Sequence, residues 1–91
     1  MFKITDNKGF QIKFENGWTV SVQWGKGNYC DNYDHNGEYG EPVPPSTTAE
    51  VAAWPEGGGE WLRFENGDVV DARYTPAQVL ELMNRVSAFP S

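Results

Sequence analysis

Apolar side chains occupy every second residue through the first quarter of this chain, and no other feature constrains its fold as strongly. They fall on even numbers: Phe2, Ile4, Phe10, Ile12, Phe14, Trp18, Val20, Val22 and Trp24. A period of two predicts β-strands with one buried face. Because a slip of one residue would move a whole apolar set into solvent, each turn must preserve that face. The segment therefore predicts three strands joined as hairpins.

The requirement that each hairpin keep its apolar residues on one face also determines the length of the turns. A two-residue turn at residues 16–17 would place Phe14 opposite Thr19, on the wrong face. A three-residue loop at 15–17 places Phe14 opposite Trp18, with the loop glycine in the left-handed conformation of a type I turn followed by a bulge. The register that follows pairs Ile12 with Val20 and Phe10 with Val22. An equivalent loop at residues 7–9 predicts the pairs Ile4 with Ile12 and Phe2 with Phe14.

A second hairpin is predicted fifty residues later. The sequence Phe-Glu-Asn-Gly of residues 14–17 returns at residues 64–67, each time after a basic residue. Internal duplication and recurrent turn chemistry both account for the repeat. We expect strands at 48–54 and 60–64, a glycine-rich connector at 55–59, and a return strand on which Leu62 faces Val70 and Phe64 faces Asp68.

One helix is predicted near the C-terminus. Thr75 is a suitable N-cap, Pro76 fits the first helical position, and Gln78 stands at the capping-box position. The helix should run to about Ala88 and bury a stripe of Val79, Leu80, Leu82, Met83 and Val86 against the sheet. The expected fold is α+β, mainly β: a single domain over residues 1–91, with an antiparallel sheet of about five to six strands built from hairpins and one C-terminal helix packed on it.

Charge and composition exclude several classes of function. The 91 residues carry a net charge of −6, with a sequence pI near 4.5, which opposes binding to nucleic acid or anionic membranes. Cys30 is the only cysteine and forms no internal disulfide. No stretch has the length or hydropathy of a membrane span, and no signal-peptide pattern opens the sequence. We expect a cytoplasmic protein.

Residues 26–47 break the strand pattern and form a long, irregular loop rich in acidic residues and tyrosine. Loops of this length in small domains are usually functional or disordered. The candidate partner-binding residues are Asp31, Tyr33, Asp34, Glu38, Tyr39 and Glu41. With a single Cys and a single His in the chain, we expect no metal site, no cofactor and no catalytic residue here.

A different set of residues would suit an anionic small molecule such as a nucleotide. Aromatic rings could stack on a base while cations and glycine amides hold phosphate. The candidates are Trp24, Lys26, Tyr29, Arg63 and Arg73. On the expected register, Arg63 and Arg73 project away from the core together with Trp61 and Asp71, opposite to Leu62, Phe64, Val70 and Ala72.

The first third of the chain resembles small uncharacterised proteins encoded by tailed bacteriophages and prophages. The resemblance rests on residues 17–30, Gly-Trp-Thr-Val-Ser-Val-Gln-Trp-Gly-Lys-Gly-Asn-Tyr-Cys, with Phe2-Lys3-Ile4 and Lys8-Gly9-Phe10 before them. It implies an accessory, non-enzymatic role in the cytoplasm of a bacterial host.

We hypothesise a small acidic binding protein, a phage accessory or counter-defence factor, that blocks a host protein with a basic surface. A nucleotide-like small-molecule sponge acting as a homo-oligomer is the alternative. A small enzyme or metal-binding domain comes third. Sheet edges that pair between subunits would make a homo-oligomer possible in either binding mode.

Overall fold

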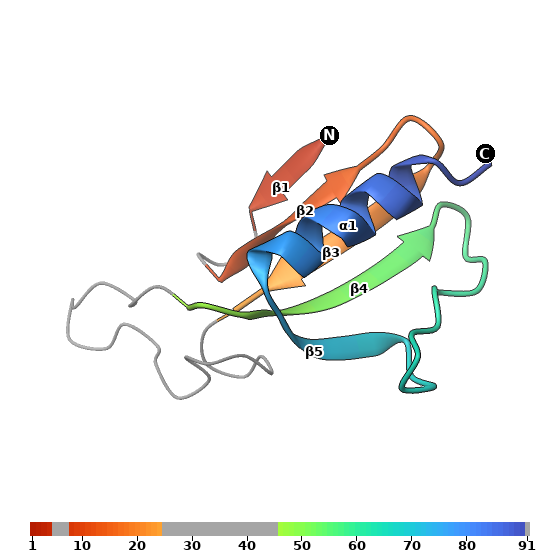
Figure 1. The fold of residues 1–91 in the computed structure, drawn as a ribbon. Helices are drawn as coiled ribbons and strands as arrows, with labels where there is room; N and C mark the ends of the chain where they lie inside the picture. The colour runs from red at the N-terminus through yellow and green to blue at the C-terminus, as the bar shows by residue number, and fades with distance from the viewer. Residues whose placement is uncertain (5–7, 25–45, 91) are drawn as a thin grey trace.

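Five strands and one helix make up the computed structural model, which describes residues 1–4, 8–24 and 46–90. The strands form one antiparallel sheet in the order β1-β2-β3-β4-β5, so each strand lies beside its neighbours in the sequence (Figure 1). The elements are β1 (Phe2–Ile4), β2 (Gly9–Lys13), β3 (Trp18–Gln23), β4 (Ala49–Pro55), β5 (Val70–Tyr74) and α1 (Pro76–Ser87). The expected α+β class, the antiparallel sheet of about five strands and the C-terminal helix are confirmed.

The β2–β3 hairpin has the predicted three-residue loop. The Phe14 amide donates to the Trp18 carbonyl at 2.9 Å, and the Gly17 amide donates to the Phe14 carbonyl at 3.0 Å. Gly17 has φ 88°, the left-handed conformation that the turn requires. The predicted pairs Phe10 with Val22 and Ile12 with Val20 are confirmed.

The register of β1 differs from the prediction by two residues. Phe2 pairs with Ile12, and Ile4 pairs with Phe10. Gly9 belongs to β2 rather than to the turn: it lies opposite Gln23, and a Cβ on Gly9 would stand 2.0 Å from the Val22 carbonyl oxygen. The hairpin therefore closes earlier than expected. A shift by an even number keeps the same face inward, so the alternation pattern cannot detect it.

The predicted strand at residues 60–64 is wrong, although the turn after it is right. Phe64 donates its amide to the Asp68 carbonyl at 2.9 Å, and Gly67 has φ 84°. Before that turn, the Leu62 amide donates to the Ala53 carbonyl, but residues 60–64 form no strand, and β5, the expected partner of this segment, pairs with β4 instead. Segment 60–64 instead places the Phe64 ring in the core, where its side chain is 7% exposed.

A β-bulge in β5 reverses its alternation. Ala49 pairs with Tyr74, whereas Val51 pairs with Asp71, so β5 has one residue more than β4 between these pairs. Arg73 adopts φ 55° at this point. Asp71 and Tyr74 consequently lie on the helix-covered face, because residues directly opposite each other share a face. This corrects three expectations: Asp71 does not project away from the core, Ala72 is exposed, and Val70 pairs with Ala52 rather than with Leu62, on the face opposite to Asp71.

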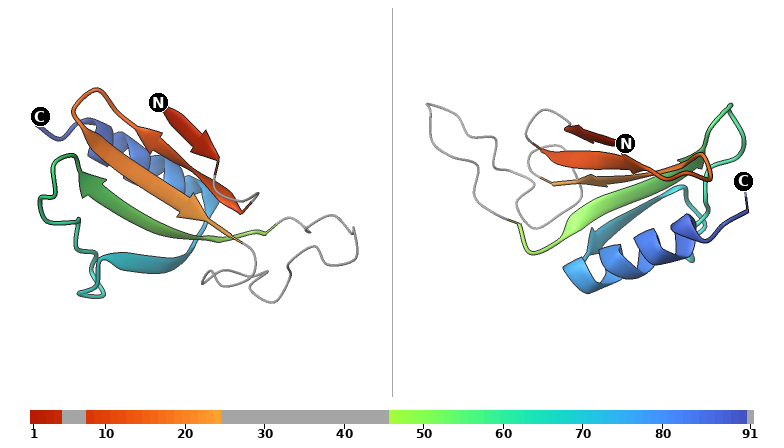
Figure 2. Two further views of the ribbon diagram at one scale, coloured as in Figure 1. Left: turned by 180° about the vertical axis from the view of Figure 1, so that it is seen from behind. Right: turned by 90° about the horizontal axis from the view of Figure 1, so that it is seen from above.

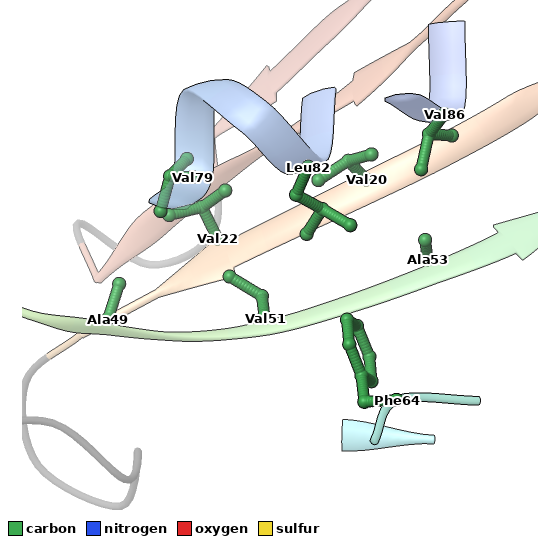
Figure 3. Packing of buried hydrophobic residues seen from close by; sticks show 9 residues of the cluster. All are labelled: Val20, Val22, Ala49, Val51, Ala53, Phe64, Val79, Leu82 and Val86. Carbon is green, nitrogen blue, oxygen red and sulfur yellow. The ribbon is translucent and has the colours of Figure 1, made fainter. Parts of the chain in front are cut away.

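The core lies between α1 and the central strands, and the opposite face of the sheet carries no helix from the described part of the chain (Figure 2). Val20, Val51 and Val86 are the largest fully buried side chains. Figure 3 shows the nine residues of the cluster, Val20, Val22, Ala49, Val51, Ala53, Phe64, Val79, Leu82 and Val86. Sheet and helix therefore contribute to a single apolar layer.

Helix α1 begins as predicted. The Gln78 amide donates to Thr75 Oγ1 at 3.3 Å, and the Thr75 amide donates to Gln78 Oε1 at 2.9 Å, which completes a capping box. One predicted core position is wrong, because Leu80 is 56% exposed. Leu80 follows the buried Val79 directly and is therefore rotated from it by about 100° around the helix axis. At that angle its side chain points away from the sheet.

Asn16 ties the β2–β3 turn to the C-terminal end of α1. Its Nδ2 donates to the carbonyl oxygens of Val86 at 2.9 Å and Phe89 at 3.0 Å, while its Oδ1 accepts from the Trp18 amide at 3.0 Å. The Trp18 and Phe89 rings meet edge to face, with centroids 5.0 Å apart. The Val86 carbonyl also accepts from the Phe89 amide at 3.1 Å, so Asn16 adds a second donor there and supplies one to the Phe89 carbonyl just beyond the helix.

Asn66, in the repeated turn, makes the same local hydrogen bond but reaches no helix. Its Oδ1 accepts from the Asp68 amide at 2.9 Å, and its Nδ2 donates to the Val70 carbonyl and to Asp71 Oδ1. Both turns therefore use an asparagine to close the loop. Only the first one connects parts of the chain 70 residues apart.

We predict that Asn16→Ala lowers the free energy of unfolding by about 1–3 kcal/mol, because it removes the donor shared by the part-buried carbonyls of Val86, in the last turn of α1, and Phe89, just beyond it. Asn66→Ala is the matched control and should cost about 1 kcal/mol or less, since its bonds are exposed. Urea unfolding of the two variants provides the comparison. Equal losses of unfolding free energy in the two variants would show that only the local turn, and not the contact with the end of the helix, contributes to stability.

Candidate functional site

Tyr74 stands where two hollows of the surface meet. It is the last residue of β5, directly before the N-cap of α1. One hollow is apolar and the other is lined mostly by polar and charged side chains, and Tyr74 lines both. No other residue in the described part of the chain belongs to both linings.

The first hollow, which we call the apolar pocket, has a volume of about 330 Å³. It lies between the end of β3, the start of β4 and the first turn of α1. Its lining is Val22, Trp24, Ser46, Thr47, Thr48, Ala49, Tyr74, Pro76 and Val79. Ala49, a core residue with a small side chain, lines this space.

Two local contacts shape the walls of the apolar pocket. The Trp24 ring packs edge to face on Phe10 at 6.4 Å between centroids, which holds it at the end of β3. On the facing wall, Ser46 Oγ donates to the Thr48 carbonyl at 2.6 Å and accepts from the Thr48 amide at 3.3 Å. Hydroxyl groups therefore border an otherwise apolar space.

The second hollow, which we call the acidic groove, runs between α1 and the segment from residue 63 to β5. It comprises two adjoining cavities of about 420 and 260 Å³. Its lining is Arg63, Phe64, Glu65, Asp71, Tyr74, Gln78, Glu81, Leu82 and Arg85. Three carboxylates and two guanidinium groups give the lining an excess of negative charge.

The two arginines of the groove are each engaged by a neighbouring group. Arg63 Nη1 donates to the Gly67 carbonyl at 3.0 Å. The Arg85 guanidinium lies 5.9 Å from the centre of the Phe89 ring, within cation–π range. Asp71 Oδ1 accepts hydrogen bonds from Asn66 and from the Ala72 amide.

The electrostatics of the groove act on the Tyr74 phenol. Burial, and then the negative charge of Asp71, raise its pKa above the ordinary value of 10.0. A hydrogen bond to the Asp71 carboxylate and the charge of Glu65 act in the same direction, and Arg85 opposes them. The neutral phenol is thus the favoured form at the junction of the two hollows.

The structure places only part of the predicted ligand set. Trp24 lines the apolar pocket and Arg63 lines the acidic groove, so the two contribute to adjoining hollows. Arg73 is exposed at the bulge and lines neither hollow. Lys26 and Tyr29 fall within 25–45, outside the described residues, as do all six candidate partner-binding residues, Asp31, Tyr33, Asp34, Glu38, Tyr39 and Glu41.

Tyr74, Asp71 and Glu81 are the site residues that the sequence analysis missed. The only signal in the sequence was the position of Tyr74 directly before a capped helix. The bulge that turns Asp71 to the same face as Tyr74 has no recognisable pattern in the sequence. Within residues 1–4, 8–24 and 46–90 there is no cluster of three or more Asp, Glu, His or Cys able to hold a metal ion. None of the helical segments described could cross a bilayer.

Comparison with protein-family models, curated proteins and solved structures finds no match for this chain. The geometry of the two hollows and the charges around them are the features that point to a function.

We predict that Tyr74→Phe makes the protein less sensitive to alkaline pH. A folded-state pKa above the unfolded value means that Tyr74 contributes its full stabilisation below about pH 10 and loses it as pH rises through the folded pKa. Urea unfolding in steps from about pH 8 to pH 11 should show the stability difference between wild type and Tyr74→Phe shrinking. A constant difference across this range would contradict the assignment.

Proposed function

We propose that this protein is a non-enzymatic binding protein that captures a basic partner protein and blocks it. The observation that carries the proposal is the meeting of an apolar pocket and an acid-rich groove at Tyr74. The apolar pocket supplies a place for one anchoring side chain, and the groove supplies charge of the sign that a basic surface complements.

The volume of the apolar pocket suits a single side chain or ring system. At about 330 Å³ it is at the lower end of the range for ligand sites. In protein interfaces a few aromatic or aliphatic side chains, buried in such pockets, contribute most of the binding free energy. Trp24 and Tyr74 offer ring surfaces to an incoming aromatic group, and the hydroxyls at residues 46–48 border it.

The charge of the chain supports a basic partner over an anionic ligand. The net charge is −6. Four of the acidic residues that contribute to it lie close in sequence to Trp24 and Ser46, namely Asp31, Asp34, Glu38 and Glu41. Negative surface charge increases the association rate with a basic protein and disfavours anions. A nucleotide-like ligand would need excess cation at the site, whereas Arg63 and Arg85 stand among three carboxylates. A phage accessory factor acting on a host protein is one setting that such chemistry fits.

Two probes with the same ring and opposite charge test the proposal. Tryptamine carries an ammonium group and indole-3-propionate a carboxylate. In ¹H–¹⁵N NMR titrations we expect both to shift the Trp24 indole and the amides of Thr48, Ala49 and Val79. Tryptamine should bind about threefold more tightly at low salt, and the difference should shrink as salt rises, because the groove charges are screened.

The pocket itself is tested with Ala49→Leu, which fills the space beside Val22, and with Ala72→Leu as the matched control at an exposed position of β5. Ala49→Leu should weaken tryptamine binding, whereas Ala72→Leu should not; circular dichroism and urea unfolding verify that both variants fold. Tighter binding of indole-3-propionate would favour the anionic small-molecule function. Absence of shifts for either probe would refute the pocket as a binding site.

A further inference from the structure

The two hollows share one lining residue, Tyr74, so one short peptide segment that crosses Tyr74 would reach both. In an extended chain, side chains at i and i+2 point the same way and stand about 6.6 Å apart. Adjacent residues point to opposite sides, and only one of them could enter a hollow.

The chemistry of each hollow selects one type of side chain. The apolar pocket is lined by Val22, Ala49, Val79 and the Trp24 ring, which suit an aromatic group. The acidic groove presents Glu65, Asp71 and Glu81, and its two arginines already contact the Gly67 carbonyl and the Phe89 ring. A lysine or arginine of the partner would add the missing positive charge.

The pKa of the Tyr74 phenol, between the two hollows, also reflects negative charge nearby. Burial is the largest cause of the raised pKa of Tyr74; the negative charges of Asp71 and Glu65 raise it further, and the charge of Arg85 opposes them. The negative field therefore reaches the junction, where the peptide backbone between the two side chains would lie.

We propose that the pocket and groove together recognise an extended partner segment with an aromatic residue followed, two positions later, by lysine or arginine. This inference rests on the proposed function, for which it names the sequence feature of the partner. Tyr74 would lie beneath the intervening residue and set the spacing.

Four blocked pentapeptides test spacing and charge separately: acetyl-Ser-Trp-Ser-Lys-Ser-amide, the same peptide with Glu in place of Lys, the same peptide with Ala in place of Trp, and acetyl-Ser-Trp-Lys-Ser-Ser-amide. Binding is followed by ¹H–¹⁵N NMR at low salt. We expect the Trp-Ser-Lys peptide to bind about threefold more tightly than the Trp-Lys peptide and about tenfold more tightly than the Trp-Ser-Glu peptide. The peptide without Trp should give no saturable shifts.

Charge-neutralising variants locate the contact with lysine. Glu81→Gln and Glu65→Gln should each reduce the preference for the Lys over the Glu peptide about threefold. Glu60→Gln is the matched control, because it makes the same change at an exposed position that lines neither hollow. Equal effects of the three variants would show that only net charge matters and would overturn the inference.

The outcomes separate this inference from the proposed function. If tryptamine shifts the residues of the apolar pocket but the peptides bind without regard to spacing, the inference fails and the proposed function stands. If neither tryptamine nor any Trp-containing peptide shifts these residues, both fail. A Trp-Ser-Glu peptide that binds as well as the Trp-Ser-Lys peptide would also refute the role of the groove.

Discussion

The structure depends on the packing of α1 on one face of the sheet, where the helix lies against β3 and β5 and covers the apolar cluster. Val86 of the helix and Val20 and Val51 of the sheet lose all or nearly all contact with solvent, and burying side chains of this size contributes about 1.5–3 kcal/mol each. The helix is also held at its two ends, by the capping box at Thr75 and by Asn16 at the last carbonyls. Because its N-terminal turn and one of its sides form walls of the apolar pocket and the acidic groove, the site depends on this packing.

The bulge at Arg73 makes the edge strand β5 part of the wall of both hollows. One extra residue turns both Asp71 and Tyr74 toward the helix, where the phenol packs edge to face on Phe64, with ring centroids 6.0 Å apart. A non-glycine residue in the left-handed conformation costs about 1–2 kcal/mol. Contacts of Tyr74 and Phe64 with the core offset that cost, so the carboxylate and the phenol remain together at the groove.

The two hollows would contribute differently to binding. Exposed charges such as Glu65 and Glu81 are screened by salt and add little affinity individually, but they increase the rate of encounter with a basic surface. An aromatic group in the apolar pocket would be shielded from water and would slow dissociation. On the proposed function, a small domain with a thin core would select its partner by charge and retain it by one buried anchor.

Local chemistry in the sequence determined the parts of the fold that depend on neighbouring residues. Alternation predicted which residues of β2 and β3 face the core, the Asn-Gly loops predicted both left-handed turns, and Thr75, Pro76 and Gln78 predicted the helix start. The tertiary structure alone decided the two-residue shift of β1, the loss of the strand at 60–64 and the bulge in β5. An even shift leaves the alternation intact, and whether a segment pairs depends on which strand already occupies the neighbouring edge. Contacts between distant segments likewise arise only in the folded chain. Examples are the hydrogen bonds from Asn16 to Val86 and Phe89, and the positions of Trp24, Tyr74 and Glu65 around the two hollows.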